Sequence, residues 1–196
     1  MGRMGQRARW AGAAAIVVAA LGACGGPTAP APQSGSQPNR AAPDTAAPAS
    51  SADCQGTSLV VSAGPGTAGL GHVGVPLLFR NSGTTPCRLA GYPGVAGLTS
   101  GGGQTQAART LGGYLGGLRS GMSSLPVIEL APGEVASALV EGTDAPAGTA
   151  TSCPSFTALL VTPPNTRQAS RLTAGLPGCS GLAVHPVVPG TTGSLS

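Results

Sequence analysis

The chain has 196 residues, of which 33 are Gly and 19 are Pro, so it has room for one ordinary domain but not for many long helices. Three of its ten Arg precede residue 11 and Lys is absent, which leaves seven Arg against six acidic residues from Cys24 onward. A nearly neutral chain with 3% aromatic residues excludes a phosphate-binding basic surface, and we expect no nucleic-acid partner.

Residues 1–23 are typical of an export signal. A start that contains three Arg is followed by an apolar run at residues 11–21. That run is too short to cross a bilayer, which needs about 20 residues, but it suits the core of a signal peptide. It ends in LGAC at residues 21–24, the pattern of a lipoprotein cleavage site, where the Cys24 thiol takes a diacylglyceryl group and the new amino terminus takes a chain such as palmitate. The alternative is an ordinary secretory signal beside a chance cysteine.

Residues 24–53 are predicted to carry the lipid on Cys24 and to form a disordered tether. From residue 25 the segment contains six Pro and no residue larger than Gln or Arg, so it cannot bury a core. A Pro-rich chain rises about 3.1 Å per residue, which gives this tether a reach of about 90 Å. Such a spacer would hold a domain on the extracytoplasmic side, within or across a cell-wall layer.

Five cysteines become an even set once Cys24 is assigned to the lipid. The other four are Cys54, Cys87, Cys153 and Cys179, and they can pair in three ways. None has the close spacing of a zinc site, so disulfides formed outside the cytosol are the better interpretation. We favour Cys54–Cys87 with Cys153–Cys179, two loops that would each contribute about 3–4 kcal/mol in the chain-entropy model.

Residues 54–190 have the pattern of an all-β domain. Residues 73–81 place Val75, Leu77 and Phe79 on one face at a period of two, and turn residues separate the apolar segments. The predicted strand segments are residues 58–63, 73–81, 125–130, 135–141, 155–162 and 182–188, together with 87–99, which contains the turn GYPGV and a short strand. We expect a small immunoglobulin-like antiparallel β-sandwich of about seven strands, linked by disulfides. A long mobile Gly-rich loop is expected at 100–124 and a flexible tail at 191–196.

Several motifs of this region resemble one known family. They are the run CRLAGYPGV at 87–95, which is the most specific, AGLGH at 68–72, FRN at 79–81, LAPG at 130–133, TPPN at 162–165 and the flanking cysteines. From Cys54 to Pro189 the chain is similar to the actinobacterial secreted and lipoprotein domain of unknown function numbered forty-two thirty-two. The resemblance implies a small β-sandwich displayed outside the membrane, and it implies no established activity.

Two motifs suggest a cofactor or a nucleophile, but each lacks what its chemistry needs. GLGHVG at residues 69–74 matches the dinucleotide fingerprint, but a strand follows it where that fingerprint requires a helix. We therefore expect no nucleotide. Ser123 lies in a partial nucleophile elbow that lacks the second Gly, and it would need His72 or His185 as its base.

His72 and His185 could also share a metal ion with an acidic residue. The acidic residues considered for this role are Glu129, Glu134 and Asp144. The spacing is not that of a metal site, and a histidine that hydrogen-bonds a turn or a strand end is the commoner case. We predict no metal, no cofactor and no catalytic residue.

The expected function is that of a lipid-anchored, extracytoplasmic binding or interaction module of the cell envelope, without enzymatic activity. Its candidate contact residues are Tyr92, Arg109 and Arg119, the partner being an envelope protein or glycan, while the bilayer holds the lipid on Cys24. One alternative is an envelope hydrolase that uses Ser123 with a histidine, and another is a purely structural lipoprotein that spaces the wall. Binding requires an exposed apolar or Arg-rimmed patch on the Gly-rich loop, whereas hydrolysis requires a histidine within hydrogen-bond reach of a Ser or carboxylate in a cleft.

Overall fold

The computed structural model describes residues 51–195 except 147, 149 and 150. The predicted signal peptide, the lipid site at Cys24 and nearly all of the predicted tether lie outside these residues. The described residues belong to the compact unit Ala46–Ser196. Among them, no helix has the length and apolar character needed to cross a membrane.

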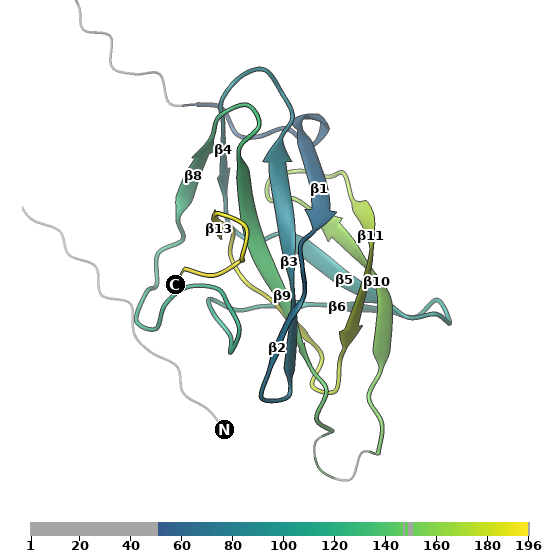
Figure 1. Ribbon diagram of the computed structural model, residues 1–196. Helices are drawn as coiled ribbons and strands as arrows, with labels where there is room; N and C mark the ends of the chain where they lie inside the picture. The colour runs from purple at the N-terminus through teal and green to yellow at the C-terminus, as the bar shows by residue number, and fades with distance from the viewer. Residues whose placement is uncertain (1–50, 147, 149–150, 196) are drawn as a thin grey trace, which may run out of the picture. The chain divides into compact units, whose positions relative to one another are not determined.

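Short strands build the domain, together with one turn of 3-10 helix, η1 (Gly56–Ser58). The strands are β1 (Leu59–Ala63), β2 (Thr67–Gly69), β3 (His72–Asn81), β4 (Cys87–Ala90), β5 (Gly94–Leu98), β6 (Gln104–Gln106), β7 (Ala108–Arg109), β8 (Val127–Leu130), β9 (Val135–Thr143), β10 (Ser155–Thr162), β11 (Ser170–Pro177), β12 (Leu182–Val184) and β13 (Val188–Pro189). One sheet has the order β1-β3-β9-β12-β7, with β2 beside β3 and β13 beside β9. The second sheet has the order β11-β10-β5-β6, and β4 pairs with β8 (Figure 1).

This arrangement confirms the predicted all-β, disulfide-linked sandwich. The described strands outnumber the predicted segments, because pieces of two or three residues such as β6 and β7 are too short to show a period in the sequence. Among the named strands of the described residues, every pair is antiparallel except the parallel pair of β12 with β7. That pair arises because the chain reaches β7 by crossing from the second sheet.

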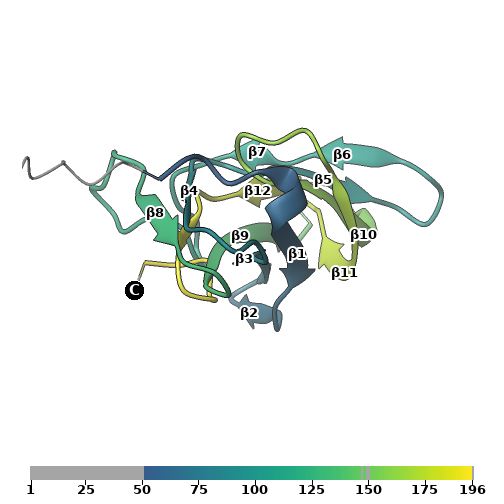
Figure 2. The ribbon, with the colours of Figure 1, turned by 90° about the horizontal axis from the view of Figure 1, so that it is seen from above.

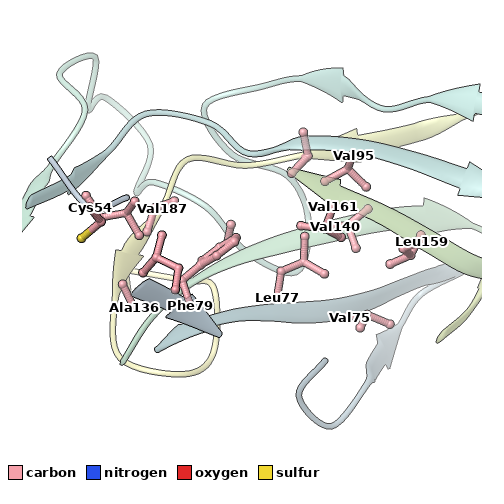
Figure 3. Packing of buried hydrophobic residues seen from close by; sticks show 14 of the residues in the cluster. Cys54, Val75, Leu77, Phe79, Val95, Ala136, Val140, Leu159, Val161 and Val187 are labelled. Carbon is pink, nitrogen blue, oxygen red and sulfur yellow. The ribbon is translucent and has the colours of Figure 1, made fainter. Parts of the chain in front are cut away.

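The core lies between the two sheets. Alternation along β3 turns Val75, Leu77 and Phe79 inward, as the period of two predicts, and they meet Val95 of β5 and Val161 of β10 (Figure 3). Burying a large apolar side chain contributes about 1.5–3 kcal/mol. This cluster is therefore the main apolar contribution to the stability of a domain with few aromatic residues.

Pro76 lies within β3, which has neighbours on both sides. Its carbonyl accepts a hydrogen bond from the amide of Gly64, in the short connection between β1 and β2. The N–H that proline lacks would face this same connection, where ladder pairing is interrupted. The strand therefore accommodates proline at a gap in its partner, as sheet geometry requires.

Residues 100–124 are not the long loop that we expected. Gln104–Gln106 pairs with β5 in the second sheet, Ala107 donates to the carbonyl of Val95, and Ala108–Arg109 then pairs with β12 in the first sheet. Seen from above, β7 and β12 lie beside β5 (Figure 2). The sequence does not predict this crossing, because such short polar strands have no alternation of apolar and polar residues.

Residues 191–195, expected to be part of a flexible tail, lie against the first sheet instead. The Gly193 amide donates to Oγ of Ser137 on β9 at 2.8 Å, and the Leu195 amide donates to the carbonyl of Gly117 at 2.9 Å. Backbone groups of this segment supply these contacts.

The structure contains the two disulfides favoured by the spacing of the cysteines. Cys54 is bonded to Cys87 with their Cα atoms 4.8 Å apart, and Cys153 is bonded to Cys179 with their Cα atoms 4.5 Å apart. The first joins the start of the domain to β4. The second joins the chain just before β10 to the chain just after β11.

Asn81 is a fully buried polar residue at the end of β3. Its side-chain amide donates to the carbonyls of Thr85 and Leu130, each at 2.9 Å, and its Oδ1 accepts from the amide of Gly83 at 2.9 Å. The side chain thereby links the β3–β4 turn to the end of β8, so that the β4–β8 pair is held against the first sheet.

Asn81→Asp is expected to lower the free energy of unfolding by about 2–4 kcal/mol, because a buried carboxylate would face two carbonyls that have lost their donors. Chemical denaturation followed by circular dichroism measures the change. The control is Gln106→Glu, the same exchange of an amide for an acid on an exposed edge strand, with an expected change below about 0.5 kcal/mol. Equal losses in the two variants would contradict the assigned role.

Candidate functional site

Strand β9 is buried on both faces, although a sheet of a sandwich commonly has one face in water. Its inward side chains include Ala136, Ala138 and Val140, and its outward ones include Ser137, Leu139 and Glu141. Two segments cover the outward side, residues 112–118 of the β7–β8 connection and residues 191–195. The Gly117 amide donates to the carbonyl of Gly193 at 2.8 Å, so the two covering segments also bind each other.

The carboxylate of Glu141 lies beneath this cover and is 5% exposed. One oxygen, Oε1, accepts from Nδ1 of His72 at 2.5 Å and from the amide of Tyr114 at 3.2 Å. The other, Oε2, accepts from the amide of Leu115 at 3.1 Å and lies 3.3 Å from Nε2 of His185. Burying a carboxylate is costly unless its oxygens are paired, and here β3, the β7–β8 connection and the chain after β12 supply the donors.

These contacts determine the charge of the site. Burial raises the pKa of the Glu141 carboxyl, but hydrogen bonds from the Leu115 amide, His185, His72 and the Tyr114 amide together outweigh burial and leave this pKa below its ordinary value. The group is therefore an ionised acceptor at neutral pH. Each imidazole nitrogen that faces it must carry a hydrogen.

His185 is completely buried and fully hydrogen-bonded. Nε2 donates to Glu141, and Nδ1 lies 3.0 Å from the hydroxyl and 3.3 Å from the carbonyl oxygen of Thr110. Both ring nitrogens are thus satisfied by the protein. His185 is a structural residue that joins the start of the β7–β8 connection to Glu141.

His72 differs from His185 in its exposure and in its second nitrogen. Its side chain is 32% exposed, and its ring stacks on Tyr114 with the ring centroids 4.8 Å apart. Nδ1 donates to Glu141, and among the described residues Nε2 has no hydrogen-bond partner. The ring is therefore oriented by two contacts while one nitrogen stays available.

Two glycines allow the β7–β8 connection to lie against this centre. A Cβ on Gly113 would be 2.7 Å from Nε2 of His185 and closer still to the Glu141 carboxylate. Gly117 has a φ of +90°, which a side chain disfavours, and its Cβ would lie 2.9 Å from the His185 ring. The glycines in GGYLGGL at residues 112–118 therefore serve close backbone approach.

The same connection exposes apolar side chains to solvent. Seven large hydrophobic side chains are exposed in the described part of the chain, and five of them lie between residues 111 and 127. These five are named the apolar surface: Leu111, Tyr114, Met122, Leu125 and Val127. Leu111 and Met122 also border a shallow hollow of about 280 Å³. Apolar side chains that gather in one exposed patch are typical of an interaction site, and Leu111 and Met122 meet at this hollow.

The predicted contact residues lie in two places. Arg109 is exposed at the end of β7 and Arg119 is exposed in the middle of the β7–β8 connection, where its Nε donates to the carbonyl of Leu195 at 3.4 Å. Tyr92 is half-buried in the turn between β4 and β5, and no contact described in residues 51–195 joins it to either arginine. Ser123 is exposed, and within the same residues no hydrogen bond links it to His72 or His185.

Sequence reasoning missed Glu141, which brings the two histidines together in place of Glu129, Glu134 or Asp144. No group of three or more His, Cys, Asp or Glu among the described residues could hold a metal ion. One signal was present in the sequence, since Glu141 is the only charged residue of β9. A charged residue in a strand that is buried on both faces needs partners. The sequence does not identify these partners, because His72 and His185 lie far from Glu141 along the chain.

A family model described as a domain of unknown function, DUF4232, matches residues 54–188. The match includes the disulfide cysteines, Glu141, both histidines and the whole β7–β8 connection. No curated protein and no solved structure matches the chain.

Glu141→Gln is expected to lower the free energy of unfolding by about 2–4 kcal/mol at neutral pH, because the new amide would place N–H groups against donors. Folding lowers the pKa of this carboxyl, so its stabilisation is complete above the ordinary value of 4.5 and is lost as the pH falls through the folded pKa. Urea unfolding from about pH 7 to about pH 3 should show this loss in the wild type but not in the variant. Glu134→Gln, on an exposed turn, is the control, and equal pH dependence in wild type and E141Q would contradict the assignment.

Gly113→Ala is expected to push the β7–β8 connection away from Glu141, because its Cβ has no space there. Hydrogen exchange at the amides of Tyr114 and Leu115 should accelerate by at least about tenfold, since these groups lose a buried acceptor. Exchange measured by NMR tests this, with Gly101→Ala as the control because a Cβ on Gly101 meets no atom within 4 Å. Unchanged protection in G113A would show that Glu141 does not hold the connection.

Proposed function

The chain belongs to the DUF4232 family of domains of unknown function, and we propose that it is a non-enzymatic interaction module. In this proposal a lipid on Cys24 holds the chain at the extracytoplasmic face of the cell membrane, as in the actinobacterial lipoproteins that it resembles. The domain binds an envelope partner through the apolar surface. The concentration of exposed apolar side chains between residues 111 and 127 is the observation that carries the proposal.

Support for the compartment comes from the sequence and from the disulfides. The LGAC motif at residues 21–24 follows an apolar run of signal-peptide length. The domain contains two disulfides, and such bonds form and persist mainly in oxidising compartments. An acylated Cys24 carrying two or three chains would be a stable anchor, because single-chain attachment is only marginal.

Support for binding comes from how the apolar surface is held. Leu111 and Tyr114 lie on either side of Gly113, in the part of the connection that donates to Glu141. A surface whose backbone is already fixed loses less conformational entropy when it associates. The arrangement therefore favours recognition by a preformed loop over folding upon contact.

The site supports a non-enzymatic role better than the two alternatives. A hydrolase of the predicted kind needs a base for Ser123, but His185 is fully buried and the described residues show no hydrogen bond between Ser123 and either histidine. The contact of His72 with a carboxylate meets one requirement of such an enzyme, an oriented base. The other requirement, contact between that base and Ser123, is not met among the described residues. A wall spacer would not require an exposed apolar segment.

Site-specific photo-crosslinking in cells that produce the full chain tests the proposal. A photoreactive amino acid replaces Tyr114, which is 55% exposed, or in the control Val60 on β1, which is 52% exposed. The expected result is an adduct in the membrane fraction from position 114 and none from position 60. Cys24→Ala should release the chain from the membrane and abolish the adduct. The absence of an adduct specific to position 114, or an intact mass without acyl chains, would contradict the proposal.

A further inference from the structure

We propose that a second hollow, beside His72 on the outer face of β9 and β12, binds one neutral, hydroxyl-rich ring such as a sugar residue. The hollow has a volume of about 210 Å³ and shares no lining residue with the apolar surface. Small residues create the space, since Ala108, Gly142, Gly181 and Ala183 line it. Sites for larger organic ligands usually measure about 300–1,000 Å³, so this one suits a single ring.

His72 lines the hollow, and its second nitrogen is the acceptor that we assign to the ligand. Because Nδ1 must carry the hydrogen donated to the Glu141 carboxylate, Nε2 holds a lone pair in the neutral ring. Contacts with Glu141 and Tyr114 fix the ring plane in advance. Nε2 can therefore accept a hydrogen bond from a ligand hydroxyl, and the protein loses little side-chain freedom when it does so.

The charge of the site selects against anionic ligands. Of the described residues that line the hollow, Glu141 alone carries a fixed charge, and it is negative, so an anion would be repelled. A cation could not pair directly with this carboxylate, because four donors already occupy its two oxygens. The hydroxyls of a neutral ligand can use the remaining donors and acceptors of the lining without pairing with Glu141.

The rest of the lining matches the two characters of a sugar ring. Thr143 and Ser180 supply hydroxyls that can donate and accept, and the Oγ1 of Thr143 is positioned by the backbone amide of Ser180 at 3.2 Å. Ala108, Leu182 and Ala183 supply apolar contact for the C–H groups of the ring. Polar groups on one side and carbons on the other favour a polyol over a wholly apolar molecule.

Titration with three related sugars tests this inference on the full chain with its disulfides intact. The probes are methyl glucoside, glucosamine and glucuronate, which are neutral, cationic and anionic versions of one ring. The side-chain nitrogen shifts of His72 and His185 are followed by NMR. Methyl glucoside should shift Nε2 of His72 in a saturable way with a Kd of about 1 mM or somewhat above, while His185 stays unchanged.

Two variants connect that response to the hollow. Ala183→Leu fills it and should abolish the shift, whereas Ala63→Leu on the exposed end of β1 should leave the shift unchanged. Ser180→Ala, on an exposed turn, removes one hydroxyl and should weaken binding about fivefold. No saturable shift with the neutral sugar, a response to the charged sugars alone, or full binding by both A183L and S180A would overturn the inference. Crosslinking from position 114 is independent of all three outcomes.

Discussion

The ionised carboxylate of Glu141 is placed on the side of β9 that a simple sandwich leaves to water, and much of the domain is arranged around it. Leaving such a group buried and unpaired costs several kcal/mol, so each of its four donors is required. Those donors come from β3, from the β7–β8 connection and from the chain after β12. The Glu141 carboxylate thus brings together parts of the chain that the core between the sheets does not join.

This requirement explains the composition of the cover. Backbone N–H groups reach a buried oxygen only if no side chain intervenes, which is why glycine stands at residues 113 and 117. The same closeness leaves Tyr114 no room inward, so its ring stacks on His72 at the surface. Burial of the acid and exposure of the aromatic ring are therefore two results of one arrangement.

Much of the scaffold follows from local pattern, whereas the site depends on distant contacts. Alternation along β3 predicts Val75, Leu77 and Phe79 as core, and the even count of cysteines after Cys24 restricts the pairings to three. The structure of residues 100–124 could not be predicted, because a glycine-rich sequence has the same composition whether it covers a polar centre or moves freely in solvent. The partners of Glu141 could not be predicted either, because His72 lies 69 residues away and His185 lies 44 residues away.

The entry of the chain into the domain has a mechanical consequence. The carbonyl of Ala52 accepts from the Arg88 amide and the Cys54 amide donates to the Arg88 carbonyl, each at 2.8 Å, next to the covalent link from Cys54 to Cys87. A pull on the amino-terminal side would load β4 along its length and through that covalent link before it reached β1. Strands loaded in this way resist in shear, so a pull from this side would not unzip the sheet that carries Glu141.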